Sequence, residues 1–493
     1  MSRPKGHRRT DTEERLKREV ERLREELAER ERQIAEQTKR IADLERQLAL
    51  RNQNSTITSK PPASDGLAGR QRIRGRRRKS RRKPGGQPGH PGYSRALVPI
   101  ERVDAIIDLA PDRCGYCHRR LRPRDEDGDP RRHQVTELPP IEAHITEYRC
   151  HRRHCPACGQ TTLARLPDDL TGQFGPQLTA LIAYLTVVCR LPRLVVQRLL
   201  EGALQISISL GSPQKAWEET SAAVAAPYRE LAAALRHEAV LNADETGHRT
   251  NGDKRWLWAF VARTFVVYHI AASRGSDVLK AVVGETFAGI LGSDRLPSYL
   301  KYVVDQRQFC WAHVTRNVLS ALDLARTPSA TRFCREALVL DRRLFRLWHR
   351  FRGDPGARGA PLTRDQLIDK VLPIEKRLSA LGEHHLDAAD DNVRNLAYAF
   401  FVHNQHFFTF VYEEGVAPTN NAAERALRTA VQWRKIMFGT RSEQGERAVE
   451  RLLTIVRTCQ LQQLNALAYL TAAITAHRRR QVAASLLKRS QTP

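Results

Sequence analysis

Four apolar runs decide the fold of this chain: A-V-L-N-A-D from Ala239, W-L-W-A-F-V-A from Trp256, F-V-V-Y-H-I-A from Phe265 and A-G-I-L-G-S-D ending at Asp294. Each run is short, rich in β-branched and aromatic residues and bounded by turn signals such as N-G-D-K, which is the pattern of buried strands. Residues 277–285 have helical spacing and lie between the third and fourth runs. The sequence therefore predicts a β-β-β-α-β unit.

Two of these runs end in a carboxylate, Asp244 in the first and Asp294 in the fourth. The predicted order is that of ribonuclease H-like domains, in which the first and fourth strands lie side by side. A third carboxylate, Glu424 in P-T-N-N-A-A-E-R-A-L-R, opens a predicted helix. Any one carboxylate is usually a solvated or capping group, but three gathered together would bind two magnesium ions, which clamp the oxygens of a phosphoryl displacement. Glu245 points to the opposite face of its strand and is predicted to be structural.

The chain has 493 residues and a formal net charge of +27. Such a field attracts polyanions and gains affinity by releasing counterions, so the predicted partner is nucleic acid. No membrane span is predicted, because the longest apolar run, residues 178–189, falls short of the ~20 residues that cross a bilayer. The basic N-terminus is followed by no apolar segment and predicts no secretory signal. We therefore expect a cytoplasmic, nucleoid-associated protein whose nine cysteines are thiols or metal ligands.

Residues 1–50 carry a seven-residue apolar repeat. One core position holds Val20, Leu27, Ile34, Ile41 and Leu48, and the other holds Leu16, Leu23 and Leu44. The positions between them are rich in Glu, Arg and Lys, which can pair across helices. This pattern predicts a coiled coil that joins copies of the chain into a homo-oligomer. A single solvated helix is the alternative.

Residues 51–95 predict a basic flexible linker, because Pro, Gly and like charges favour an extended chain. Arg and Lys make up most of residues 70–83, and such side chains contact phosphates without reading sequence. The predicted DNA contacts in this run are Arg76, Arg77, Arg78, Lys79, Arg81, Arg82 and Lys83. A second predicted set, Arg425, Arg428, Arg434 and Lys435, lies on or next to the helix that Glu424 opens. For the linker, a solubilising role is the alternative.

Two C-x-x-C motifs predict a zinc-binding module over residues 96–165. Cys114 and Cys117 lie in C-G-Y-C, and Cys155 and Cys158 lie in C-P-A-C. Each motif points two thiolates at one metal, and four thiolates close the tetrahedral coordination sphere of a structural zinc ion. Cys150, His151 and His154 are rival ligands, and reduced cysteines without metal are the alternative.

The remaining segments are predicted from their apolar spacing. Residues 166–236 are helical and form either a helix-turn-helix that reads DNA or a plain spacer. Residues 237–319 and 415–480 are the two parts of the sheet domain, and residues 320–414 are a helical insertion with a Gly/Pro-rich break at 353–361. Arginines of the insertion either contact DNA or form a solvated face: Arg342, Arg343, Arg346 and Arg350. Trp311 is predicted to pack in the core, since Cys310 and His313 alone lack a full ligand set for a metal. A role for His313 in supporting the site or in contacting DNA is the alternative.

Several motifs together resemble those of one transposase family. They are S-K-P-P-A-S-D-G from Ser59, P-G-G-Q-P-G-H-P-G from Pro84, the two cysteine motifs, A-D-E-T from Ala243, S-D-R from Ser293, F-C-W-A-H-V-T-R from Phe309, T-N-N-A-A-E-R-A-L-R from Thr419 and F-G-T-R-S from Phe438. With these motifs the chain resembles, over nearly its whole length, a transposase of the insertion sequence 66 family. Members of this family are bacterial DDE enzymes with a ribonuclease H-like catalytic domain.

This resemblance implies a metal-binding triad of Asp244, Asp294 and Glu424. It also implies terminal repeats and target DNA as substrates, and small accessory proteins of the same element as partners. Two rival functions remain at the level of sequence. One is a zinc-dependent DNA-binding regulator, or an inactive transposase relative, in which the carboxylates are idle. The other is a nuclease of the same fold that cuts DNA but never joins strands, because both reactions use the same ions.

Overall fold

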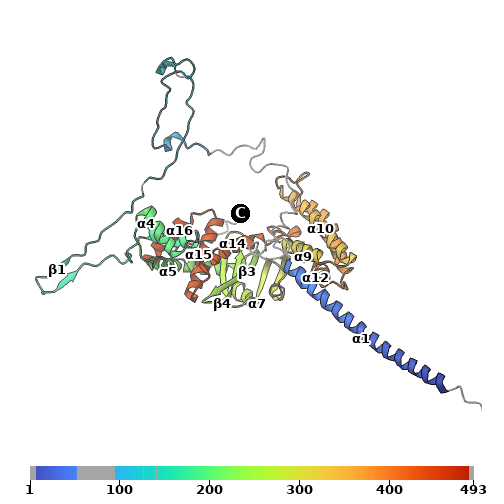
Figure 1. Ribbon diagram of the computed structural model, residues 1–493. Coiled ribbons are helices and arrows are strands. Elements are labelled where there is room, and N and C mark those ends of the chain that lie inside the picture. The colour runs from blue at the N-terminus through green and yellow to red at the C-terminus, as the bar shows by residue number, and fades with distance from the viewer. Residues whose placement is uncertain (1–6, 53–94, 126, 140, 488–493) are drawn as a thin grey trace, which may run out of the picture. The chain divides into compact units, whose positions relative to one another are not determined.

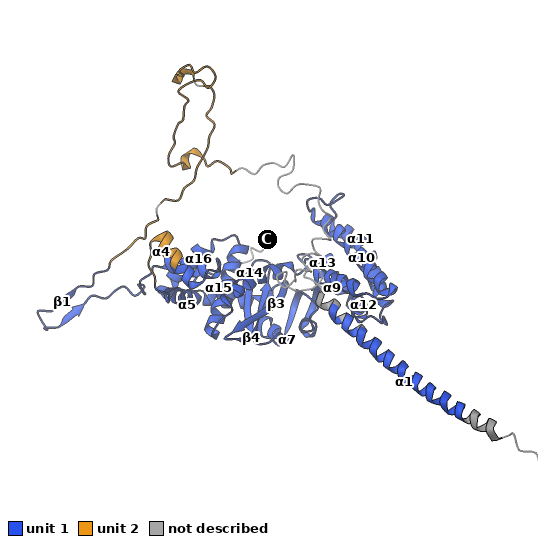
Figure 2. Cartoon of the chain, viewed as in Figure 1, with its two compact units in different colours: residues 1–76, 148–197, 209–493 blue, residues 77–147, 198–208 orange. Residues whose placement is uncertain are grey.

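The computed structural model describes residues 7–52, 95–125, 127–139 and 141–487 (Figure 1). The chain divides into two compact units (Figure 2). The larger unit comprises residues 1–76, 148–197 and 209–493, and the smaller one comprises residues 77–147 and 198–208. Among the helices of the described residues, none is both long enough and apolar enough to cross a membrane.

The larger unit contains a five-stranded sheet. Its strands are β3 (Val240–Thr250), β4 (Asp253–Val261), β5 (Val266–Ala271), β6 (Thr286–Ser293) and β7 (Val303–Phe309), in the spatial order β5-β4-β3-β6-β7. The first three strands are antiparallel, whereas β3, β6 and β7 are parallel. Asn251 and Gly252 join β3 to β4, both with positive φ, which is the backbone of the tight hairpin turn that N-G favours.

The helix between β5 and β6, α7 (Ser276–Val283), completes the predicted β-β-β-α-β order. The structure adds a short helix, α8 (Pro297–Lys301), and the fifth strand β7, neither of which the sequence analysis identified. The reason lies in the composition of β7, V-V-D-Q-R-Q-F, where charged and apolar residues mix and burial begins only near its end. Without a clear period of two, such a segment gives no strand signal.

The outer edge of the sheet, formed by β5, is covered by α15 (Glu443–Leu461). Three of its side chains, four residues apart, accept hydrogen bonds from alternate N–H groups of the strand. Glu450 accepts from Ile270 at 2.6 Å, Thr454 from Tyr268 at 2.9 Å and Thr458 from Val266 at 3.2 Å. Because an open edge offers unpaired backbone groups to other chains, this helix both satisfies and protects it.

The sheet and α15 form one hydrophobic core with further helices: α3 (Pro176–Val187), α5 (Ser212–Ala223), α6 (Ala225–Ala234), α14 (Asn421–Met437) and α16 (Ala466–Arg478). The predicted helical segment 166–236 thus forms helices, together with α4 (Arg193–Leu204). Whether α4 and α5 read DNA stays a prediction.

Residues 311–412 form a helical bundle around a second core. Its elements are α9 (Trp311–Leu324), α10 (Pro328–Arg352), α11 (Arg364–Glu383), α12 (Asp391–Val402), η5 (Asn404–Phe407) and α13 (Thr409–Tyr412). α10 ends at Gly353, whose φ of 64° is a left-handed conformation that favours glycine. α11 begins with a capping box at Thr363, so the predicted break at 353–361 is the loop between two well-capped helices.

The N-terminal region forms one long helix, α1 (His7–Asn52). Its heptad residues are exposed: Leu27 and Ile34 each keep 61% of their accessible surface. The helix is as predicted, while its pairing with a second copy stays a prediction. Residues 53–94 of the predicted basic linker lie outside the described residues. They include its proposed DNA contacts Arg76, Arg77, Arg78, Lys79, Arg81, Arg82 and Lys83. Short elements follow it: η2 (Ile100–Arg102), η3 (Pro123–Asp125) and the hairpin of β1 (Arg152–His154) and β2 (Thr161–Leu163).

Candidate active site

Two of the three predicted carboxylates lie on neighbouring parallel strands. Asp244 is in the middle of β3, and Asp294 directly follows β6. Asn242 pairs with Gly292 in the β3–β6 ladder, so the two aspartates lie two residues further along their strands at the same level of the sheet. Backbone pairing of β3 and β6 therefore brings both carboxylates to the same end of the two strands.

The third carboxylate, Glu424, lies in the first turn of α14. Asn420, at the N-cap of this helix, is buried, and its Nδ2 donates to the carbonyl of Ala243 at 2.7 Å. The N–H of Asn420 also donates to Cys310 Sγ at 3.1 Å, and the N–H of Cys310 donates to the carbonyl of Ser293 at 2.9 Å. A continuous set of hydrogen bonds therefore connects the chain next to all three carboxylates.

Negative charge accumulates where these segments meet. The pKa of Asp244 is raised well above its usual range, first by burial and then by the charges of Glu245, Asp294 and Glu424. A hydrogen bond from the N–H of Glu245 opposes this effect only in part. Buried carboxylates that repel one another need a cation to remain ionised together. Oxygen ligands of this kind are those that magnesium prefers, so the donor set fits the predicted metal.

Two basic side chains from α9 reach Glu424: His313, for which a supporting or DNA-contacting role was the alternative prediction, and Arg316, which was not predicted. Arg316 Nη2 lies 3.2 Å from Glu424 Oε1, and His313 Nδ1 lies 3.5 Å from the same oxygen. Burial, together with the charge of Arg316, lowers the pKa of His313. The motif C-W-A-H-V-T-R indicates that His313 and Arg316 share one face of a helix, because they are three residues apart. It does not indicate that this face meets Glu424.

The same corner contains a further possible metal-binding group. The ligand atoms of Cys310, His313 and Glu424 all lie within 4.8 Å of one another. Cys310 and His313 alone lack a full ligand set, and the fold supplies a carboxylate, Glu424, from a helix more than a hundred residues further along the chain. Trp311 is a core residue as predicted: it is buried, and its Nε1 donates to the carbonyl of Phe407 at 2.6 Å.

Glu245 has a separate set of partners. Arg274 Nη2 lies 2.7 Å from its Oε1, and the hydroxyl of the fully buried Tyr299 donates to its Oε2. Burial nevertheless raises the pKa of Glu245. Its partners tie β3 to the segments that follow β5 and β6, which fits the structural role predicted from the alternation of the strand.

Two of the predicted basic residues of α14, Arg425 and Arg428, lie within about one turn of Glu424, and the other two, Arg434 and Lys435, lie about three turns further along the helix. Arg425, Arg428 and Lys435 are exposed. At 3.6 residues per turn, they and Glu424 fall within roughly a third of the helix circumference. Arg434 is half-buried: burial lowers its pKa, and its Nη1 donates to Thr246 Oγ1 at 3.4 Å. Three of the four predicted contacts are therefore open to a phosphate chain that passes the carboxylates.

Each cysteine motif forms a tight knuckle. Hydrogen bonds from the N–H groups of Cys117 and Tyr116 lower the pKa of Cys114, and those of Cys158 and Ala157 lower the pKa of Cys155. These bonds favour the thiolate, which is the form that binds zinc. The two knuckles belong to different compact units. Each one by itself presents two thiols in a turn whose N–H groups favour the thiolate.

The chain was compared with known proteins. A family model described as "Transposase IS66 family" matches residues 171–448, and one described as a family of unknown function (DUF6444) matches residues 3–96. An uncharacterized protein, y4qI of Sinorhizobium fredii (strain NBRC 101917 / NGR234), is 24% identical over 245 residues, which cover 45% of this chain and 43% of that protein. The chain thus spans less than half the length of this relative.

Proposed function

Because the chain belongs to the IS66 family of transposases, we propose that it is a DDE transposase that cuts the ends of a bacterial insertion sequence and joins them to target DNA. The observation that carries this proposal is the set of hydrogen bonds through Asn420 and Cys310, which links the chain beside Asp244, Asp294 and Glu424. The matched segment contains all three residues. The strand order, with antiparallel β5-β4-β3 beside parallel β6 and β7, supports a ribonuclease H-like catalytic domain.

The triad would hold two magnesium ions. When bound, they supply activation of water or a DNA 3′-hydroxyl and stabilisation of the leaving 3′-oxygen. The chain's own residues fix where this chemistry takes place. β3 and β6 hold Asp244 and Asp294 at one level of the sheet, while Arg316 holds the carboxylate of Glu424. Phosphates approaching along α14 would be bound by Arg425, Arg428 and Lys435, whose cationic groups are exposed on the helix surface.

The N-terminal regions would serve DNA binding and assembly. The exposed heptad row of α1 supports pairing of copies of the chain, and the basic linker supports contact with the backbone of terminal repeats and target DNA. Small accessory proteins of the same element are further proposed partners. The two knuckles support one structural zinc ion held by Cys114, Cys117, Cys155 and Cys158.

Elemental analysis tests the zinc proposal. Freshly purified, reduced protein should contain one zinc per chain, and Cys114→Ser should release it, because the ligand is the thiolate. The matched control is Cys189→Ser, since Cys189 is exposed and lies outside both motifs. Zinc retained in full by Cys114→Ser would exclude this ligand set.

A strand-transfer assay tests the proposed function. Wild-type protein with magnesium should cleave a labelled terminal-repeat duplex and join the cut end to a second duplex. Asp244→Asn keeps the shape of the side chain and removes its charge, and it should slow cleavage by roughly 10²–10³-fold or more, as expected for a lost electrostatic group. DNA binding should remain. Cleavage without joining would identify a nuclease instead, and binding without cleavage would identify a regulator or an inactive relative.

A further inference from the structure

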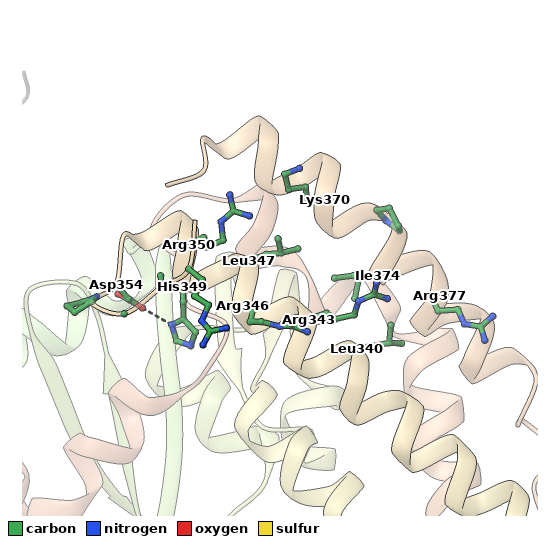
Figure 3. Close-up of a pocket in the computed structure, with 15 residues that line it drawn as sticks. Leu340, Arg343, Arg346, Leu347, His349, Arg350, Asp354, Lys370, Ile374 and Arg377 are labelled. Atoms are coloured by element: carbon green, nitrogen blue, oxygen red, sulfur yellow. Dashed lines mark hydrogen bonds and ion pairs between the residues drawn. The ribbon is translucent and has the colours of Figure 1, made fainter. Parts of the chain in front are cut away.

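The helical bundle contains a large cavity between α10 and α11. None of the three carboxylates of the candidate active site lines it. Its volume is about 1250 Å³. The floor is apolar, with Leu340 and Leu347 from α10 and Ile374 from α11 (Figure 3). The loop after α10 closes one end, where the guanidinium of Arg350 donates to the carbonyl of Ala360 at 3.0 Å.

The rim of this cavity is strongly basic. Six cationic side chains line it: Arg343, Arg346, Arg350, Arg358, Lys370 and Arg377. Of the described residues that line it, one is acidic, Asp354, and it is already paired with His349 at 2.7 Å. Arg377 is paired with Glu336. Within the described part of the chain, Arg343, Arg358 and Lys370 have no carboxylate partner, so positive charge is left for a ligand.

The arrangement follows from the spacing along the two helices. Arg343, Arg346 and Arg350 are three and four residues apart, so they form one stripe on α10 beside Leu340 and Leu347. Lys370, Ile374 and Arg377 form the corresponding stripe on α11. Both stripes face the same cavity (Figure 3). Arg342, which was predicted together with the other α10 arginines, is not among the residues that line the cavity.

Charge and shape together point to the occupant. Guanidinium and ammonium groups bind phosphates, and apolar floors accept the faces of unpaired bases. A duplex buries its bases and would leave the floor unused. Small-molecule sites are usually roughly 300–1,000 Å³, whereas this cavity is larger. We propose that the α10–α11 cavity binds a single strand of DNA, with phosphates on the basic rim and bases on the apolar floor. This inference rests on the proposed transposase function.

Two charge-matched variants test the rim. Arg343→Gln with Lys370→Gln removes two cavity charges, and Arg342→Gln with Lys376→Gln removes two exposed charges from the same helices outside the cavity. The probe is a short labelled oligothymidine strand, compared with a matched duplex over a salt series. Only the cavity variant should lose affinity for the strand, with a salt slope flatter by about 1.4, which is about 0.7 for each phosphate contact. Equal losses in both variants would overturn the proposal.

A third variant tests the floor. Leu347→Gln keeps the charges and a similar size, so it should weaken strand binding without changing the salt slope, and thermal melting should show whether it is folded. A bromouracil-substituted strand should cross-link within residues 340–377. Cross-links elsewhere in a protein that still cuts and joins DNA would overturn the cavity proposal alone. Cavity cross-links in a wild-type protein that neither cuts nor joins would support the cavity and overturn the proposed function.

Discussion

Negative charges lie close together inside the sheet domain at the candidate active site, whereas positive charges line the rim of the α10–α11 cavity in the helical bundle. The difference in burial decides how each region responds to change. Inside the sheet, burial and neighbouring carboxylates raise the pKa of Asp244, so every partner there affects the ionisation of the others. On the rim, exposed charges interact through solvent and are screened by salt. We therefore expect large, mutually dependent effects at the first region and small, nearly additive effects at the second.

The largest effect in this comparison is expected from Asn420→Ala. The substitution leaves the buried carbonyl of Ala243 without its 2.7 Å hydrogen bond and frees the start of α14. A buried unsatisfied group costs about 1–3 kcal/mol of unfolding free energy. Because Glu424 then moves relative to the two aspartates, cleavage should fall and need more magnesium for half-maximal rate. Thermal melting and magnesium titrations of single-turnover cleavage measure the two parts.

The control for Asn420→Ala is Asn421→Ala, the exposed next residue on the same helix. A protein with Asn420→Ala that is less stable but cleaves with an unchanged magnesium requirement would show that Asn420 only supports the fold. The strands and α14 would then place the carboxylates without the hydrogen bond of Asn420, and effects in the candidate active site would not depend on one another through this residue.

An intermediate effect is expected from Asp341, a carboxylate in the bundle that has no acidic cluster around it. Burial raises its pKa to about 6, with Thr315 and Arg342 opposing. Since its unfolded pKa is about 4, the folded protein binds more protons between about pH 4 and pH 6, and stability should fall as the pH rises through this window. Asp341→Asn should flatten that part of the curve of Tm against pH.

The control for Asp341→Asn is Asp369→Asn on the exposed face of α11. If both variants follow the wild-type curve, Asp341 does not titrate as its burial implies. Stability would then depend as little on the ionisation of a buried carboxylate in the bundle as on the exposed charges of the cavity rim. That result would assign the sensitivity of the candidate active site to its neighbouring carboxylates rather than to burial.

Sequence patterns identified local features better than links between distant segments. The first four strands were predictable because β-branched runs between turns have few other folds, and the turn at Asn251 and Gly252 is encoded in two residues. The cysteine knuckles are equally local. Asn420 joins residues 177 positions apart in the chain, and no periodicity signals such a bond. The contact between Arg316 and Glu424 spans 108 positions, so it too became visible only in the folded chain.

The smallest effect is expected from Arg428→Gln on α14. Arg428 is exposed and shares a helix face with Glu424, so it would contact a phosphate without reading a base. Losing that contact should weaken binding to terminal-repeat and random duplexes alike and flatten the salt slope by about 0.9. Arg447→Gln, an exposed arginine of α15 that lies near Glu443, is the control. A loss confined to the terminal repeat would mean that Arg428 reads sequence. The surface charges of α14 would then not act additively, in contrast to what is expected for the rim of the α10–α11 cavity.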